Sequence, residues 1–158
     1  MLKRLDVSYI DLLLIHWPVG DYCGAWKDME KAVEAGKLKS IGLSNFKGKY
    51  LEDILKIAKI NPVVDQVECH PYAPCDDLRK ELDKINCYIE AWSPIGRGDK
   101  NLLNEEILVN LGKKYNKTVP QIILRWHIEK GNIVFPKSSN PVHIKENWDI
   151  FDFKLTKE

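Results

Sequence analysis

The sequence lacks several features that would place it in a specialised class of protein. No apolar run approaches the roughly 20 residues that a membrane-spanning helix needs. Neither sign of charge dominates, because 24 Lys and Arg residues stand against 23 Asp and Glu residues. The resulting net charge of +1 provides no long-range field suited to nucleic acid or to an acidic membrane surface. We therefore expect neither nucleic acid nor a membrane as a partner.

The four cysteines, Cys23, Cys69, Cys75 and Cys87, form no CxxC pair and no evident disulfide framework. Two of them flank His70 and raise the question of a zinc site, but a fourth ligand at the usual spacing is missing. Nothing at the N-terminus resembles a secretory signal. The sequence therefore predicts reduced thiols, no bound metal and a cytoplasmic location.

An ordinary globular composition is arranged in an alternating pattern. Hydrophobic residues make up 44% of the 158 residues and charged residues 30%, which is typical of a soluble domain with a core. Short apolar runs predict five buried strands. They are Tyr9 to His16, Leu38 to Leu43, Val63 to Val67, Cys87 to Trp92, and Ile133 to Phe135.

Amphipathic segments between and after these runs predict helices. They are Ala25 to Ala35, Tyr50 to Ala58, a segment from Asp76 or Asp77 to Ile85, Glu105 to Tyr115, and segments that begin at Thr118 and at Asn140-Pro141. Strands that alternate with helices indicate a parallel sheet with right-handed crossovers. No low-complexity segment or linker interrupts the pattern, so we expect a single α/β domain over residues 1–158.

Polar residues lie at or just beyond the ends of the predicted strands, where ligands gather in parallel α/β folds. They are His16, Ser44-Asn45, Gln66, Trp92-Ser93 and Lys137-Ser138. Each one alone has an ordinary interpretation, such as a turn or a core side chain. Taken together they predict a site at one rim of the sheet. We interpret His70 as structural and His127 as a packing or surface residue.

Five motifs carry a resemblance to a known family: DLLLIHWP, GLSNF, DQVECHPY, EAWSPIGRG and FPKSSNPVHIKEN. In this order and at these intervals they resemble the second half of an aldo-keto reductase, a (β/α)8 TIM barrel that uses NADPH to reduce aldehydes and ketones to alcohols. The resemblance implies a partial barrel of about five βα units, corresponding to strands 4–8. It also implies a single domain that is truncated at the N-terminus and shortened at the C-terminus.

The resemblance assigns roles to the residues at the first three strand ends. His16 matches the histidine of the catalytic tetrad, which hydrogen-bonds the carbonyl oxygen of a small substrate, and Trp17 matches a residue of the substrate pocket. Ser44, Asn45 and Gln66 match positions that hydrogen-bond the nicotinamide carboxamide. Their chemistry fits this role, because an amide needs both donors and acceptors.

The resemblance also places cofactor contacts after the fourth strand. Trp92 matches the aromatic residue that stacks on the nicotinamide. Ser93, Ile95 and Gly96 match the loop that contacts the pyrophosphate, where a glycine allows the backbone to approach closely.

The last motif matches the adenosine end of the cofactor site. Segment 137–140 corresponds to the 2′-phosphate contacts, and the adenine contacts lie on the helix that follows. These residues are Lys137, Ser138, Ser139 and Asn140 for the phosphate, and Glu146 and Asn147 for the adenine. His143 stands where the family commonly has an arginine. Because imidazole is mostly neutral at pH 7 and lacks a fork of donors, we expect a weakened preference for NADPH, with NADH as an alternative cofactor.

The Asp, Tyr and Lys of the tetrad have no counterpart here, since Tyr9, Tyr22 and Tyr72 match other positions. Loss of a positioned general acid alone removes roughly 10²–10⁴ of rate. We expect an NADP(H)-dependent oxidoreductase fragment that is inactive alone, and a complementing N-terminal fragment or self-association through open strand edges. A non-catalytic dinucleotide-binding or interaction module and a decayed or split gene product are the alternatives, so enzyme activity is left open.

Overall fold

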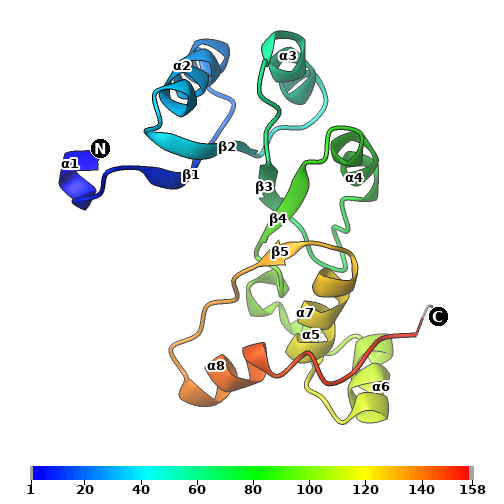
Figure 1. Cartoon of the computed structure of the whole chain (residues 1–158). Helices are drawn as coiled ribbons and strands as arrows, with labels where there is room; N and C mark the ends of the chain where they lie inside the picture. Colours follow the sequence, from blue (N-terminus) through cyan, green and yellow to red (C-terminus); the bar gives the residue numbers. More distant parts are fainter. Residues whose placement is uncertain (1, 157–158) are drawn as a thin grey trace. The chain divides into compact units, whose positions relative to one another are not determined.

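The computed structural model describes residues 2–156 and has five strands in this range (Figure 1). The strands are β1 (Ile10–Ile15), β2 (Leu38–Ser44), β3 (Val64–Glu68), β4 (Tyr88–Trp92) and β5 (Ile133–Val134). They follow the sheet order β1-β2-β3-β4-β5. Pairing is parallel between β1 and β2, β2 and β3, and β4 and β5. All five predicted strands are confirmed, with each end within one residue of the prediction.

Each predicted helix is also present. The longer helices are α2 (Tyr22–Glu34), α3 (Lys49–Ile57), α4 (Asp76–Asp83), α6 (Glu106–Tyr115), α7 (Val119–Glu129) and α8 (Pro141–Trp148). The sequence analysis missed three short elements: α1 (Leu2–Leu5), η1 (Gly96–Gly98) and α5 (Lys100–Leu103). Each is shorter than the window over which helical periodicity becomes visible. Helix α2 begins earlier than predicted because the Asp21 carboxylate caps it by accepting a hydrogen bond from Gly24 N.

The described residues divide into two compact units. Unit 1 comprises residues 2–67 and 76–89, and unit 2 comprises residues 68–75 and 90–156. Unit 1 holds β1, β2 and helices α1 to α4, whereas unit 2 holds β5, η1 and helices α5 to α8; β3 and β4 contribute residues to both. The single domain expected over residues 1–158 stays a prediction.

The core of unit 1 lies between β2 and the helices that cover it. Strand β2 pairs with β1 as far as Ile15 opposite Leu43, and with β3 at Ser44 opposite Gln66. Helix α2 packs on β1, β2 and α3, and its Trp26 is fully buried. This register aligns the carboxyl ends of β1 and β2 with the middle of β3.

Unit 2 is organised around α7, which packs against α6, α8 and β5. Its residues Ile122, Ile123 and Leu124 are all buried. The helix starts at a capping box, in which the Thr118 backbone N donates to Gln121 Oε1 at 2.9 Å, as the Thr118 start predicted from sequence requires.

The structure adds observations on the classes of site considered from sequence. Among residues 2–156, no helix is both long and apolar enough to cross a bilayer. The same range contains no group of three His, Cys, Asp or Glu side chains placed to hold a metal ion. All four cysteines are free thiols. His70 lies in a turn that a β-bridge to Ala73 closes.

Gly42 in β2 provides a test of this packing. A Cβ added there would lie 2.6 Å from Leu14 Cδ2 and 2.8 Å from the Val64 carbonyl oxygen, which strand pairing holds in place. We expect Gly42→Ala to lower the free energy of unfolding by about 1–3 kcal/mol through overpacking, measured by urea denaturation. Lys39→Arg on the exposed side of the same strand should change it by less than about 0.5 kcal/mol. Equal stabilities of the two variants would contradict the packing described here.

Candidate functional site

Four of the predicted site residues meet at the strand ends of unit 1. The Asn45 side-chain Nδ2 donates to the His16 carbonyl at 3.3 Å and to Ser44 Oγ at 2.9 Å. The Ser44 hydroxyl donates to the Gln66 carbonyl at 3.0 Å, and so does the Asn45 backbone N. These residues, which we call the strand-end cluster, therefore link the carboxyl ends of β1 and β2 to the middle of β3 through one chain of hydrogen bonds.

The local backbone explains why the Asn45 side chain faces this way. Asn45 has a left-handed conformation with φ of 65°, which asparagine tolerates better than most residues. The chain turns there, and the next residue, Phe46, is fully buried. Its backbone N donates to Oδ1 of the buried Asp65 at 3.4 Å. The turn after β2 is thus held by the side-chain bonds of Asn45 and by the backbone bond from Phe46 to Asp65.

His16 and Trp17 present two rings beside this cluster. His16 is the first residue after β1 and is exposed, and Trp17 keeps 51% of its surface exposed. The two ring centroids lie 5.9 Å apart. An accessible imidazole next to an apolar ring provides a hydrogen-bonding group and a hydrophobic wall for a small ligand.

A second group of predicted residues lines a cavity in unit 2. The cavity has a volume of about 440 Å³ and lies beside the loop that follows β4. Trp92, Ser93, Ile95 and Lys137 all line it. Arg97 lines it as well, and the sequence analysis did not select this residue. The available signal was its place in the quoted motif EAWSPIGRG, where a cation directly follows a glycine at a strand end.

Arg97 is held in place by its own loop. Its Nε donates to Ser93 Oγ at 3.1 Å, and its guanidinium carbon lies 5.4 Å from the centroid of the Trp92 ring. Ser93, Gly96 and Arg97 all have left-handed backbone conformations, with φ between 52° and 58°. Such conformations are costly for the two non-glycine residues and are typical of functional sites. The loop thus turns back and carries a cation over an indole face.

The start of α8 adds further groups that suit an anion. Asn140 caps the helix by accepting a hydrogen bond from Val142 N at 2.9 Å, and its own backbone N donates to Ser138 Oγ at 3.1 Å. Ser138, Lys137 and Asn147 line an adjoining cavity of about 420 Å³. The amino end of a helix favours negative charge. A lysine beside this end strengthens the preference.

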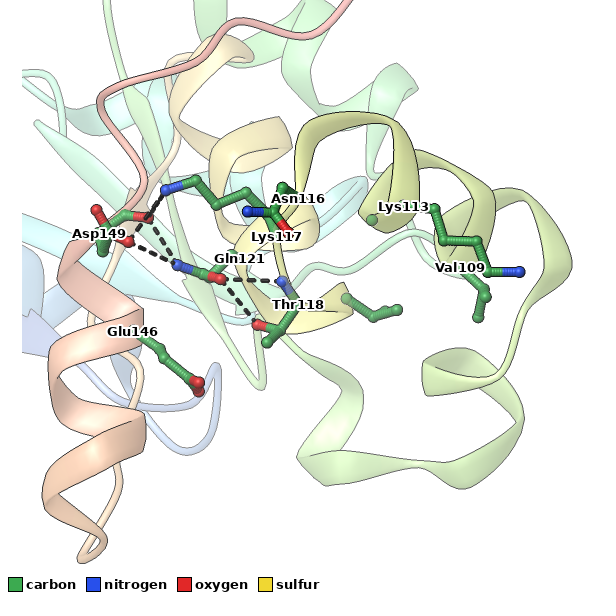
Figure 2. Close-up of a pocket in the computed structure, with 10 residues that line it drawn as sticks. Val109, Lys113, Asn116, Lys117, Thr118, Gln121, Glu146 and Asp149 are labelled. Atoms are coloured by element: carbon green, nitrogen blue, oxygen red, sulfur yellow. Dashed lines mark hydrogen bonds and ion pairs between the residues drawn. The ribbon is translucent and has the colours of Figure 1, made fainter.

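Seven predicted residues of unit 2 do not line the 440 Å³ cavity: Gly96, Ser138, Ser139, Asn140, His143, Glu146 and Asn147. Ser139 and His143 are exposed, and neither is among the residues that line the cavity within the described range. Glu146 points from α8 into a larger cavity of about 620 Å³, which α6 and α7 also line (Figure 2). The structure therefore does not bring Ser139, His143 and Glu146 into one cavity with Trp92 and Lys137.

The 620 Å³ cavity is braced by ion pairs. Figure 2 shows Lys117 and Gln121 directed at Asp149, with Lys117 Nζ 3.0 Å from Asp149 Oδ2 and Gln121 Nε2 2.7 Å from the Asp149 carbonyl oxygen. Lys117 Nζ also lies 2.8 Å from the Asp152 carboxylate. The hydrogen bond from Lys117 lowers the pKa of Asp152, and the pKa of Lys117 is raised in return. Since two carboxylates neutralise its ammonium, Lys117 acts as a brace between the turn before α7 and the chain after α8.

Comparison with known proteins identifies the family. The sequence model described as the Aldo/keto reductase family matches residues 1–158. The chain belongs to this family. Glyoxal reductase of Bacillus subtilis (strain 168) is 45% identical to it over 158 residues. Crystal structures of an aldo/keto reductase from Brucella melitensis and of the Bombyx mori aldo-keto reductase in complex with NADP superpose with TM-scores of 0.90 and 0.88, at 46% and 35% identity.

The chain spans little more than half the length of these relatives. The alignments cover 98–99% of the chain, but only 56% of the glyoxal reductase, 60% of the Brucella structure and 56% of the Bombyx structure. The aldo/keto reductase resemblance is confirmed, as is the α/β class with parallel strands that match part of a TIM barrel.

The Lys117 brace yields a prediction about stability and pH. We expect Lys117→Met to lower the midpoint of thermal unfolding at pH 7, and to lower it less as the pH falls below about 4, the unfolded pKa of an aspartate. The folded pKa of Asp152 is lowered, so its contribution to stability is present above that pH and is lost as the pH falls through the folded pKa.

Circular dichroism melts at pH 7 and pH 3 measure the effect. Lys113→Met is the matched control, because Lys113 is an exposed lysine that lines the same cavity from α6. It should leave the midpoint nearly unchanged at both values. An equal loss for Lys117→Met at pH 7 and pH 3 would contradict the electrostatic origin of the brace.

Proposed function

We propose that this chain is the NADP(H)-binding part of an oxidoreductase that reduces aldehydes or ketones to alcohols, and that it is inactive alone. The observation that carries the proposal is the 440 Å³ cavity, where Arg97, Lys137 and the Trp92 ring meet. A nicotinamide dinucleotide presents phosphates and flat aromatic rings, so two cations beside an indole match its chemistry. The Bombyx relative, solved in complex with NADP, supports this choice of ligand.

Residues of unit 2 are proposed for the phosphates, for the adenosine and for one face of the nicotinamide ring. Arg97 and Lys137 supply positive charge for the phosphates, and Trp92 supplies the stacking surface for the nicotinamide. Ser93, Ile95 and Gly96, proposed for the pyrophosphate, lie in the loop after β4. The start of α8 suits the 2′-phosphate through Lys137 and its neighbours. The remaining groups proposed for the adenosine end are Ser138, Ser139, Asn140, His143, Glu146 and Asn147.

His143 affects which cofactor this end prefers. It is exposed on α8, at the position where the family commonly has an arginine. An imidazole offers less positive charge and fewer donors to a 2′-phosphate than a guanidinium does. We therefore propose that NADPH is the cofactor, and that the difference between the affinities for NADPH and NADH is reduced.

Residues at the strand ends of unit 1 are proposed for the nicotinamide carboxamide and for the carbonyl compound. Ser44, Asn45 and Gln66 offer hydroxyl and amide groups in one hydrogen-bonded cluster. His16 would donate a hydrogen bond to the substrate oxygen, with Trp17 as an apolar wall. NADPH, when bound, supplies the hydride for such a reduction. Because no tyrosine of this chain matches the family's proton donor, this fragment lacks the general acid that the reaction needs.

The outer strands provide the surface for the proposed partner. β1 and β5 are the terminal strands of the sheet order. Tyr9, Ile133 and Phe135, beside or within these strands, are exposed. Open strand edges and apolar side chains favour pairing with a further chain. A complementing N-terminal segment is the proposed partner, and self-association is the second choice.

Two other interpretations follow from the same residues. One is a non-catalytic module that binds the dinucleotide. It is favoured because the chain has residues that match the family's cofactor contacts but none that match the Asp, Tyr and Lys of the tetrad. A decayed or split gene product is the other.

The four free cysteines support a reducing compartment, so we propose a cytoplasmic location.

A fluorescence titration with NADPH tests the binding proposal. We expect saturable binding at micromolar concentrations, and a loss of about tenfold or more in affinity for Lys137→Met, since a charge-assisted contact with phosphate contributes about 1.5–3 kcal/mol. Lys113→Met, which alters an exposed lysine on α6, should bind as the unaltered chain does. The same titration with NADH measures the margin between the two cofactors. Absence of saturable binding to either would refute the proposal.

A turnover assay tests the proposed inactivity. With NADPH and glyoxal, the compound after which the Bacillus relative is named, the chain alone should give no decrease in nicotinamide absorbance above background. Adding a purified fragment that contains the N-terminal part of that relative should restore measurable activity by complementation. A rate for the chain alone that equals that of the full-length relative would show that the inactivity proposal is wrong.

A further inference from the structure

His127 on α7 is a fully buried histidine that the proposed function does not use. Its Nε2 lies 3.0 Å from the Pro94 carbonyl oxygen, and its Nδ1 lies 2.9 Å from Asn132 Nδ2. A carbonyl oxygen accepts only, and an amide nitrogen donates only. The imidazole is therefore neutral, with its single proton on Nε2 donated to Pro94 and its Nδ1 lone pair accepting from Asn132.

The acceptor of this bond belongs to the loop of the 440 Å³ cavity. Pro94 lies between Ser93 and Ile95, and all three line the cavity. Proline has no backbone N–H, so its carbonyl is the one backbone group through which this residue accepts or donates a hydrogen bond. His127 holds that group from the side of α7. The bond thus ties down a loop in which Ser93 and Arg97 have left-handed conformations.

Asn132 fixes the histidine in turn. It is 4% exposed, its backbone N donates to the His127 carbonyl at 2.9 Å, and its side chain contacts Nδ1 of the same residue. Asn132 Nδ2 also lies 3.7 Å from the Sγ of the buried Cys69. The chain reaches this position through Gly131, whose φ of 73° allows the turn after α7. The contact of Asn132 with Nδ1 and the contact of Pro94 with Nε2 therefore set the orientation of the ring.

We propose that His127 is a positioning residue for nucleotide binding, which holds Pro94 so that Arg97 and Trp92 keep their places around the cavity. The identity of the ligand rests on the proposed function, whereas the action of His127 on the loop does not. Simple core packing is the competing explanation, since the rings of His127 and Trp126 lie 4.7 Å apart. The two explanations differ because packing needs only the volume of the ring, whereas positioning needs its Nε2–H donor.

The first test needs no substitution. Long-range nitrogen–proton NMR of the ¹⁵N-labelled chain without nucleotide should show a His127 ring with a pyrrole-like Nε2 and a pyridine-like Nδ1 throughout the neutral pH range. A proton on Nδ1, or a mixture of the two neutral forms, would overturn the proposal, because Pro94 would then have lost its donor.

The second test separates the donor from the volume. His127→Gln keeps an N–H donor at the end of its side chain, whereas His127→Phe keeps a ring of similar size without one. We expect His127→Phe to shift the amide resonances of Ile95, Gly96 and Gly98 in the free chain, and His127→Gln to restore them. Ile122→Val, about 140° around the same helix, should lower the unfolding midpoint and leave these resonances in place.

Titration with NADPH then connects the loop to binding. His127→Phe should bind NADPH about tenfold more weakly than the unaltered chain, in keeping with loss of a buried hydrogen bond, and His127→Gln should recover most of the affinity. Unchanged loop resonances in His127→Phe, or identical effects of the Phe and Gln variants, would overturn the positioning role. If the unaltered chain binds no NADPH, the proposed function fails, while the resonances still decide whether His127 holds the loop.

Discussion

Parallel pairing of β2 with β1 and β3 is the constraint on which the unit 1 site depends. Because the pairing is parallel, Ile15, Leu43 and Asp65 lie side by side in the sheet, and the residues that follow them share one neighbourhood. Gly42 keeps the strands close enough for this register. The bonds that Asn45 makes to His16 and Ser44 exist because the backbone has already aligned the ends of β1 and β2.

In unit 2, helix α7 has a comparable role. Its first turn is fixed by the capping box at Thr118 and by Gln121, which also bonds to Asp149. Its last turns carry His127 to the Pro94 carbonyl in the loop after β4. A single helix thus joins the ion-pair brace at one end to the loop at the other.

The sequence was informative wherever a local rule determines structure. Alternating apolar runs located the strands, Thr118 marked the start of a helix, and residues at strand ends located the cluster around Asn45. It was uninformative where structure depends on distant partners. Arg97 lies in a loop, where no helical or strand periodicity marks a residue. The buried position of His127 depends on Pro94, a residue 33 positions away in the chain.

The bond between Arg97 and Ser93 has a consequence for the thermodynamics of ligand capture. A long arginine side chain that is free in solution loses roughly 2 kcal/mol of rotamer freedom when a ligand immobilises it. Here the guanidinium is already fixed by a hydroxyl and rests over an indole. The Arg97 side chain has therefore lost much of its conformational freedom before a ligand arrives. Binding of an anion then costs less side-chain entropy than it would with a mobile cation.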